Sequence, residues 1–215
     1  MNRLYTIIIV ATLSFSFAAI RTEKSDHMGQ LRFLSGRLHY ITGNLENGVR
    51  SFLYSIRNQL GHKDAHAFPL DYHKNGKNNT QHFTFQQTYN DIPVFGRYIR
   101  VHANGNIITG LSSNVDKIDL SIIPMITMFG AIDIIRTDYI SNSAYLQYKN
   151  LQIYVYNNIP HLVHTIDVVS FEDPWKFMVD AHSGEIIDSF PLIYKEGSVI
   201  GSGINLLNET IDTLY

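Results

Sequence analysis

Hydrophobic residues along this chain of 215 residues change their spacing several times. Between Leu45 and Leu60 they recur every three or four positions, which predicts an amphipathic helix that ends at Gly61. From residue 81 to residue 89, aromatic and polar residues alternate instead, which predicts a strand with Phe83, Phe85, Gln87 and Tyr89 on one side. The first half of the chain therefore predicts a helix followed by strands.

A hairpin is predicted after this strand. Asn90-Asp91-Ile92-Pro93 interrupts the alternation, which resumes from Val94 to His102, so we expect two strands joined by a slightly long turn. Asn104-Gly105 then predicts a second turn, leading into a strand over residues 106–113.

The second half repeats this order of elements. Helical spacing returns between Met125 and Ile135, and four short β-rich runs follow at the end of the chain, over residues 151–156, 162–169, 175–179 and 185–190. We expect an α+β fold of two small modules, each a helix packed on an antiparallel sheet, with the boundary between residues 115 and 116.

Composition narrows the class of protein. Apolar residues make up 45% of the chain, while 17 basic residues nearly balance 19 acidic ones without forming a basic run, so we expect folded modules and no nucleic-acid partner. Cysteine is absent, which excludes disulfides and thiol chemistry. Arg3, the apolar run 4–13 and Ser16-Phe17-Ala18 predict a signal peptide over residues 1–19, and hence a secreted or periplasmic protein without membrane contact after cleavage. An uncleaved membrane anchor is the alternative.

Motifs for catalysis are missing from the sequence. It has no His-Glu-x-x-His, no Gly-x-Ser-x-Gly and no phosphate-binding glycine loop, so we expect no catalytic residue and no metal ligand. His161 and His164 are three residues apart and would project to opposite faces of a strand, which prevents joint ligation. An enzyme in which these two histidines and an acidic residue bind zinc in a new arrangement is an alternative.

Two segments resemble modules of a known pro-region. Residues 68–115 resemble the fungalysin/thermolysin propeptide module, and the matching positions are Phe85, Gln86, Gln87, Tyr89, Ile92, Pro93, Val94, Gly96, His102 and Gly105. Residues 162–187 resemble a PepSY module, and the matching positions are Trp175, Phe177, Val179, Asp180, Ala181 and Gly184. In the second module we expect Gly184 in the left-handed conformation and Asp180 capping the turn.

The resemblance implies boundaries along the chain. A propeptide-like module would cover residues 20–115, and a PepSY-like module with a cystatin-like fold would cover residues 116–192. Residues 193–215 resemble a processing junction followed by the truncated start of a mature peptidase. The processing region would consist of Glu196, Gly197, Ser198 and Val199.

The resemblance also implies a function. A pro-region of this kind binds, inhibits and assists the folding of a thermolysin-like zinc metallopeptidase, in cis within a full precursor or in trans. Residues 192–198 would occupy the cleft. The chain itself would not be an enzyme and would need no cofactor, because zinc and calcium would belong to the missing peptidase domain. The alternatives are a truncated, inactive remnant or fragment of such a precursor, and an exported ligand-binding module unrelated to peptidases.

Overall fold

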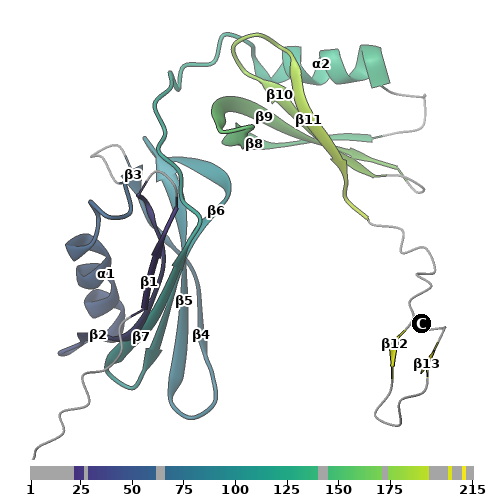
Figure 1. Ribbon diagram of the computed structural model, residues 1–215. Coiled ribbons are helices and arrows are strands. Elements are labelled where there is room, and N and C mark those ends of the chain that lie inside the picture. The colour runs from purple at the N-terminus through teal and green to yellow at the C-terminus, as the bar shows by residue number, and fades with distance from the viewer. Residues whose placement is uncertain are drawn as a thin grey trace, which may run out of the picture. The chain divides into compact units, whose positions relative to one another are not determined.

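The computed structural model contains two helices and a mainly β-stranded body among the residues that it describes (Figure 1). Those residues are 22–26, 29–61, 66–139, 145–170, 174–193, 203–204 and 210–211. They belong to two compact units. Unit 1 comprises Met1–His62, Leu70–Phe85 and Tyr98–Val115, and unit 2 comprises Lys63–Pro69, Gln86–Arg97 and Asp116–Tyr215.

Unit 1 is a helix, α1 (Leu45–Ser55), packed on a sheet (Figure 1). The strands run in the order β1–β2–β7–β6–β5–β4. Their bounds are Thr22–Ser25 for β1, Leu31–Tyr40 for β2, Leu70–Asn75 for β4, Thr80–Tyr89 for β5, Ile92–Asn104 for β6 and Ile107–Ser113 for β7. The alternation that predicted β5 is present, because Phe83, Phe85 and Gln87 are all buried.

Helix α1 is shorter than its hydrophobic spacing predicts. The side chain of Asn44 accepts a hydrogen bond from the Asn47 N–H at 3.0 Å and caps the start of the helix. At the other end, the Ser55 hydroxyl donates to the Phe52 carbonyl at 2.7 Å, and the Ile56 N–H is shared between two carbonyls at 3.3 Å. The helix therefore ends at Ser55, although Ile56 and Leu60 in the following turns are still buried.

The turn between β5 and β6 is tighter than expected. Asn90 and Asp91 have φ values of 45° and 64°, and β6 begins at the next residue. Two consecutive left-handed residues are the signature of a two-residue hairpin turn, and Asn and Asp tolerate that conformation better than other non-glycine residues. The prediction of a long turn is therefore wrong, and Ile92 and Pro93 lie in the strand.

Unit 2 is a helix, α2 (Met128–Tyr139), on one face of an antiparallel meander (Figure 1). The strands run in the order β8–β9–β10–β11, with bounds Tyr145–Tyr156, Ile159–Val169, Trp175–Asp180 and Ile186–Pro191. Short strand β3 (His66–Ala67) pairs with the end of β5 in this unit, and β12 (Gly203–Ile204) pairs with β13 (Thr210–Ile211). The core beneath α2 consists of Ala131, Ile135, Ile166, Val168, Phe177 and Val179.

Helix α2 begins three residues later than the spacing from Met125 suggests. The backbone N–H groups of Met125 and Ile126 both donate to the Ala181 carbonyl at 2.8 Å, so they hold the chain outside the helix. The Thr127 hydroxyl then accepts from the Gly130 N–H at 3.2 Å, as a helix-capping side chain does.

An α+β fold of helices packed on sheets is confirmed. No described helix has the length and apolar character needed to cross a membrane. The predicted signal peptide lies outside the described residues.

Candidate functional site

The tip of the β5–β6 hairpin carries much of the propeptide-like motif and belongs to unit 2. Val94 is fully buried and forms a parallel bridge with Ile153 of β8. The hairpin tip thereby joins a second apolar cluster, whose buried members are Val94, Ile118, Ile153, Leu162 and Ala181, with Tyr89 and Ile92 packed against them. The motif thus contributes to the core of unit 2 instead of forming an exposed loop.

Polar groups of the same hairpin bind the backbone at Asp116. The Gln87 side chain donates to the Asp116 carbonyl at 2.6 Å and accepts from the Asp116 N–H at 3.0 Å. It is only 1% exposed, so both ends of a buried amide are satisfied by one residue. Arg97 donates to the Asp116 carboxylate at 2.5 Å, and the Gln86 side chain donates to the Val94 carbonyl at 3.3 Å. These bonds attach the start of the segment leading to α2 to the hairpin.

Aromatic rings gather where the hairpin meets the sheet of unit 2. The ring of Phe95 lies 5.8 Å from that of Tyr154 and 6.0 Å from that of Phe190, measured between centroids. The Tyr154 hydroxyl donates to the Asp188 carboxylate. Burial and this hydrogen bond raise the pKa of Tyr154 to about 12, so the hydroxyl stays protonated at neutral pH. This cluster offers aromatic contact area, and its hydroxyl already donates its proton to Asp188.

The turn between β10 and β11 is built around Asp180. Its Oδ1 accepts from the N–H groups of His182 and Ser183 at 2.8 and 2.9 Å, and its Oδ2 lies 2.9 Å from Nδ1 of His161. Burial opposes ionisation of this carboxyl group, but the hydrogen bonds from Ser183, His161 and His182 outweigh it and hold its pKa below the ordinary value. Gly184 has a φ of +81°, the left-handed conformation expected of it.

The two histidines of β9 have separate partners. His161 binds Asp180, whereas Nε2 of His164 lies 2.8 Å from the Ile126 carbonyl and its Nδ1 lies 3.3 Å from the Tyr148 hydroxyl. In the part of the chain that the structure describes, no group of three histidine or acidic side chains is placed to hold a metal ion. The described geometry therefore gives the alternative zinc arrangement no support.

The remaining residues of the propeptide-like motif lie in unit 1 or shape the hairpin. Phe85 is fully buried, and the guanidinium of Arg50 in α1 lies 5.5 Å from its ring centroid. Gly105 has a φ of +57° in the β6–β7 turn, and Gly96 has a φ of +67° within β6. His102 of β6 is hydrogen-bonded to His82 of β5. Phe85, Gly96 and Gly105 thus each have a structural role in the sheet or its turns.

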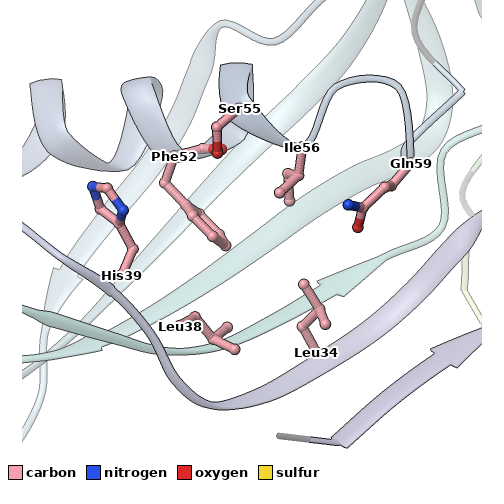
Figure 2. Close-up of a pocket in the computed structure, with 7 residues that line it drawn as sticks. All are labelled: Leu34, Leu38, His39, Phe52, Ser55, Ile56 and Gln59. Carbon is pink, nitrogen blue, oxygen red and sulfur yellow. The ribbon is translucent and has the colours of Figure 1, made fainter.

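A small pocket lies between α1 and β2 in unit 1. Figure 2 shows Phe52 and Ile56 on the helix side and Leu34 and Leu38 opposite them. The pocket has a volume of about 180 Å³, and its other lining residues are His39, Ser55 and Gln59. Ligand pockets typically measure about 300–1,000 Å³, so this one is better matched to a single side chain than to a cofactor.

Exposed apolar side chains gather before and within the first turn of α2. Ile123, Met125 and Phe129 are 73%, 79% and 69% exposed. Leu192 and Ile193, which follow β11, are also exposed. Large apolar groups in solvent mark candidate contact surfaces. The predicted processing region, Glu196 to Val199, lies outside the described residues.

Sequence reasoning missed the contact between Gln87 and Asp116. It placed Gln87 on the same side of the strand as the buried aromatic residues without assigning a partner to its amide. That placement was itself a signal, because a polar side chain in a core-facing row needs hydrogen-bond partners. Its partner could not be identified from the sequence, since Asp116 lies 29 residues further along the chain.

Three comparisons relate this chain to known proteins. The family model of the Fungalysin/Thermolysin Propeptide Motif matches residues 71–109, from within β4 into β7. A bacillolysin of Brevibacillus brevis is 25% identical over 181 residues, covering 75% of this chain and 34% of that protein. The Bacillus megaterium YpeB C-terminal domain aligns with a TM-score of 0.38 at 12% identity, covering 76% of this chain and 73% of that domain.

The matched residues define a class of protein. The chain carries a propeptide motif of the fungalysin/thermolysin type, and the recognition of a thermolysin-family pro-region is confirmed by that motif and by the similarity to bacillolysin. It spans about a third of the length of that bacillolysin. The assignment of residues 116–192 to a PepSY module with a cystatin-like fold stays a prediction.

Proposed function

We propose that this chain is an exported pro-region that binds a thermolysin-like zinc metallopeptidase, inhibits it and assists its folding. The match of residues 71–109 to the propeptide motif is the observation that supports this proposal most directly. The chain would act without a catalytic group of its own. Zinc and calcium would belong to the peptidase.

Inhibition would come from the segment that leaves β11. Leu192 and Ile193 are 39% and 61% exposed, and the Leu192 N–H donates to the Pro174 carbonyl at 2.8 Å, beside the start of β10. An extended segment can add to a cleft as an extra strand, with main-chain hydrogen bonds giving affinity and side-chain pockets giving specificity. We place the cleft-binding segment at residues 192–198.

Folding assistance would follow from binding to the native state. A partner that binds the folded peptidase and not its unfolded chain shifts the equilibrium toward the folded form. The two units provide a surface that is formed before the peptidase folds, because each has its own buried core. Action in cis within a precursor and action in trans use the same contacts.

The test is a titration of a purified thermolysin-like peptidase with the full chain, while peptide hydrolysis is followed and the intactness of the chain is checked by mass spectrometry. We expect inhibition at nearly stoichiometric concentrations, followed by slow cleavage near Val199. Unchanged hydrolysis together with rapid digestion of the chain would overturn the proposal in favour of an inactive remnant. Unchanged hydrolysis with an intact chain would overturn it in favour of a module unrelated to peptidases.

A matched pair of variants tests which segment enters the cleft. Ile193→Asp places a charge in the segment after β11, and Ile159→Asp places the same charge at the start of β9, where the native side chain is 58% exposed. We expect Ile193→Asp to weaken inhibition at least tenfold and Ile159→Asp to leave it unchanged. Equal effects would show that the cleft-binding segment lies elsewhere.

Refolding tests the second activity. Denatured peptidase is diluted into buffer with and without the full chain, and recovered activity is measured after the inhibitor has been digested. A higher yield with the chain present is expected. The same yield with and without the chain would refute folding assistance. Inhibition would then be the only one of the two proposed activities that remains.

A further inference from the structure

Two histidines of unit 1 contact each other across neighbouring strands. His82 of β5 and His102 of β6 approach with their Nδ1 atoms 2.7 Å apart, and their rings meet edge to face at 74°. The contact is partly buried. A hydrogen bond between these two atoms requires one Nδ1 to carry a proton and the other to be bare.

This requirement limits how many protons the pair can bind. With both rings neutral, one Nδ1–H donates to the other Nδ1. One added proton is still compatible with this hydrogen bond, because a charged ring can donate to a neutral one. A second proton would leave two N–H groups facing each other at hydrogen-bond distance, so it must break the contact.

The charged side chains described next to the pair on β4 and β6 are cations. Lys74 of β4 is the cross-strand neighbour of His82, and Arg100 lies two residues before His102 on the same face of β6. Against His102 the neighbouring strand β7 presents Gly110, where an added Cβ would lie 3.5 Å from the ring. In the β4–β5 turn, an added Cβ at Gly76 would lie 2.9 Å from Nε2 of His82.

The other neighbours described on these elements carry no negative charge. The Thr80 hydroxyl donates to the Lys77 carbonyl in the β4–β5 turn, and Lys77 is a further cation there. Thr109 of β7 donates to the His102 carbonyl rather than to its ring. Burial, followed by the charges of His82 and Arg100, lowers the pKa of His102 below its ordinary value of 6.5.

We propose that the His82–His102 pair is a pH-sensitive contact that weakens unit 1 when the second ring is protonated. The inference goes beyond the proposed function and does not depend on a peptidase partner. Since His102 binds its proton less readily in the folded chain than in the unfolded one, its contribution to stability is complete above about pH 6.5. That contribution is lost as the pH falls from there through the lowered pKa.

Hydrogen exchange of the full chain tests the proposal. Exchange is measured between pH 7.5 and 5.5, corrected for intrinsic rates, in peptides that cover β5, β6 and β7. We expect the opening constant of unit 1 to rise at least threefold as the pH falls, with a limit of about tenfold per pH unit for each extra proton. In His82→Asn/His102→Asn, whose amides can replace the Nδ1 hydrogen bond without titrating, this rise should disappear.

His73→Gln is the matched control. His73 also lies in this sheet, but its ring stacks on Phe83 on the other face and its Nε2 lies 2.9 Å from the Gln81 side chain. Replacement should leave the pH dependence of exchange intact. Equal pH dependence in the wild type and in the double asparagine variant would overturn the proposal.

Ring-nitrogen NMR of the wild-type chain gives a measurement that needs no variant. At neutral pH we expect one Nδ1–H and one bare Nδ1 in the pair, and protonation of His102 only below its ordinary pKa of 6.5. Titration of His102 at its ordinary pKa would overturn the proposal even if the double variant failed to fold.

Discussion

The buried amide of Gln87 permits a quantitative test of how the hairpin is attached in unit 2. Gln87→Met keeps the approximate length and volume of the side chain but removes both polar atoms. The variant loses the bonds of 2.6 and 3.0 Å to the Asp116 backbone. Gln86→Met is the matched control, because it removes a single bond of 3.3 Å from a side chain that is less buried.

The expected magnitude follows from the number of bonds and their burial. Each hydrogen bond contributes about 0.5–1.5 kcal/mol net, and a buried backbone group that loses its partner adds about 1–3 kcal/mol. Because Gln87 is 1% exposed, water cannot readily replace its amide. We therefore expect Gln87→Met to lower the free energy of unfolding of unit 2 by about 2–4 kcal/mol, and Gln86→Met by about 0.5–1 kcal/mol.

Urea unfolding of the full chain measures the difference. Trp175 is the single tryptophan and lies in β10 of unit 2, so its fluorescence reports on that unit. With a urea dependence of about 2 kcal/mol per molar, the midpoint should fall by about 1–2 M in Gln87→Met. A shift no larger than that of Gln86→Met would refute the reasoning, because it would mean that the two bonds to Asp116 contribute little.

Two further predictions concern the β10–β11 turn. Gly184→Ala should destabilise unit 2 by about 1–3 kcal/mol, because φ is +81° and the new Cβ would lie 3.1 Å from Ile134. Trp175 fluorescence in urea measures this change, and an unchanged urea midpoint would contradict the prediction. Since the pKa of Asp180 is lowered, its stabilising effect is complete above the ordinary value of 3.8 and is lost as the pH falls below it. Asp180→Asn should reduce the fall of the urea midpoint between pH 5 and pH 3, and an equal fall in variant and wild type would refute this assignment.

Sequence patterns predicted those elements whose two faces differ clearly. In β5 the alternation of aromatic and polar residues matches the observed burial, and in α1 the spacing of Val49, Phe52 and Leu53 matches the buried face. Strand β4 was not predicted, since its residues are mostly polar and exposed and give no alternation of burial. Strand β2 was also missed, and it contains Gly36 at a φ of 125°, where its pairing register with β7 shifts.

Element boundaries depended on bonds that a local pattern does not contain. The start of α2 is set by the Ala181 carbonyl, which accepts from Met125 and Ile126 more than fifty residues away in sequence. The end of α1 is set by the Ser55 side chain bonding to the backbone. Periodicity identifies which residues can share a face, whereas hydrogen-bond partners decide where each element stops.

In the candidate site, several motif residues are buried, whereas the most exposed apolar residues lie outside the motif. Phe85, Gln87 and Val94 are at most 1% exposed, so these motif residues cannot contact a partner without unfolding. A motif made of such residues identifies an architecture, because it constrains the hairpin and the cores it enters. Contact with the proposed peptidase partner would fall to exposed residues such as Phe129 and Ile193, neither of which is a motif position. Substitutions in the motif should therefore act through stability, and substitutions in the exposed segments through affinity, which is why urea unfolding and inhibition must be measured on the same variants.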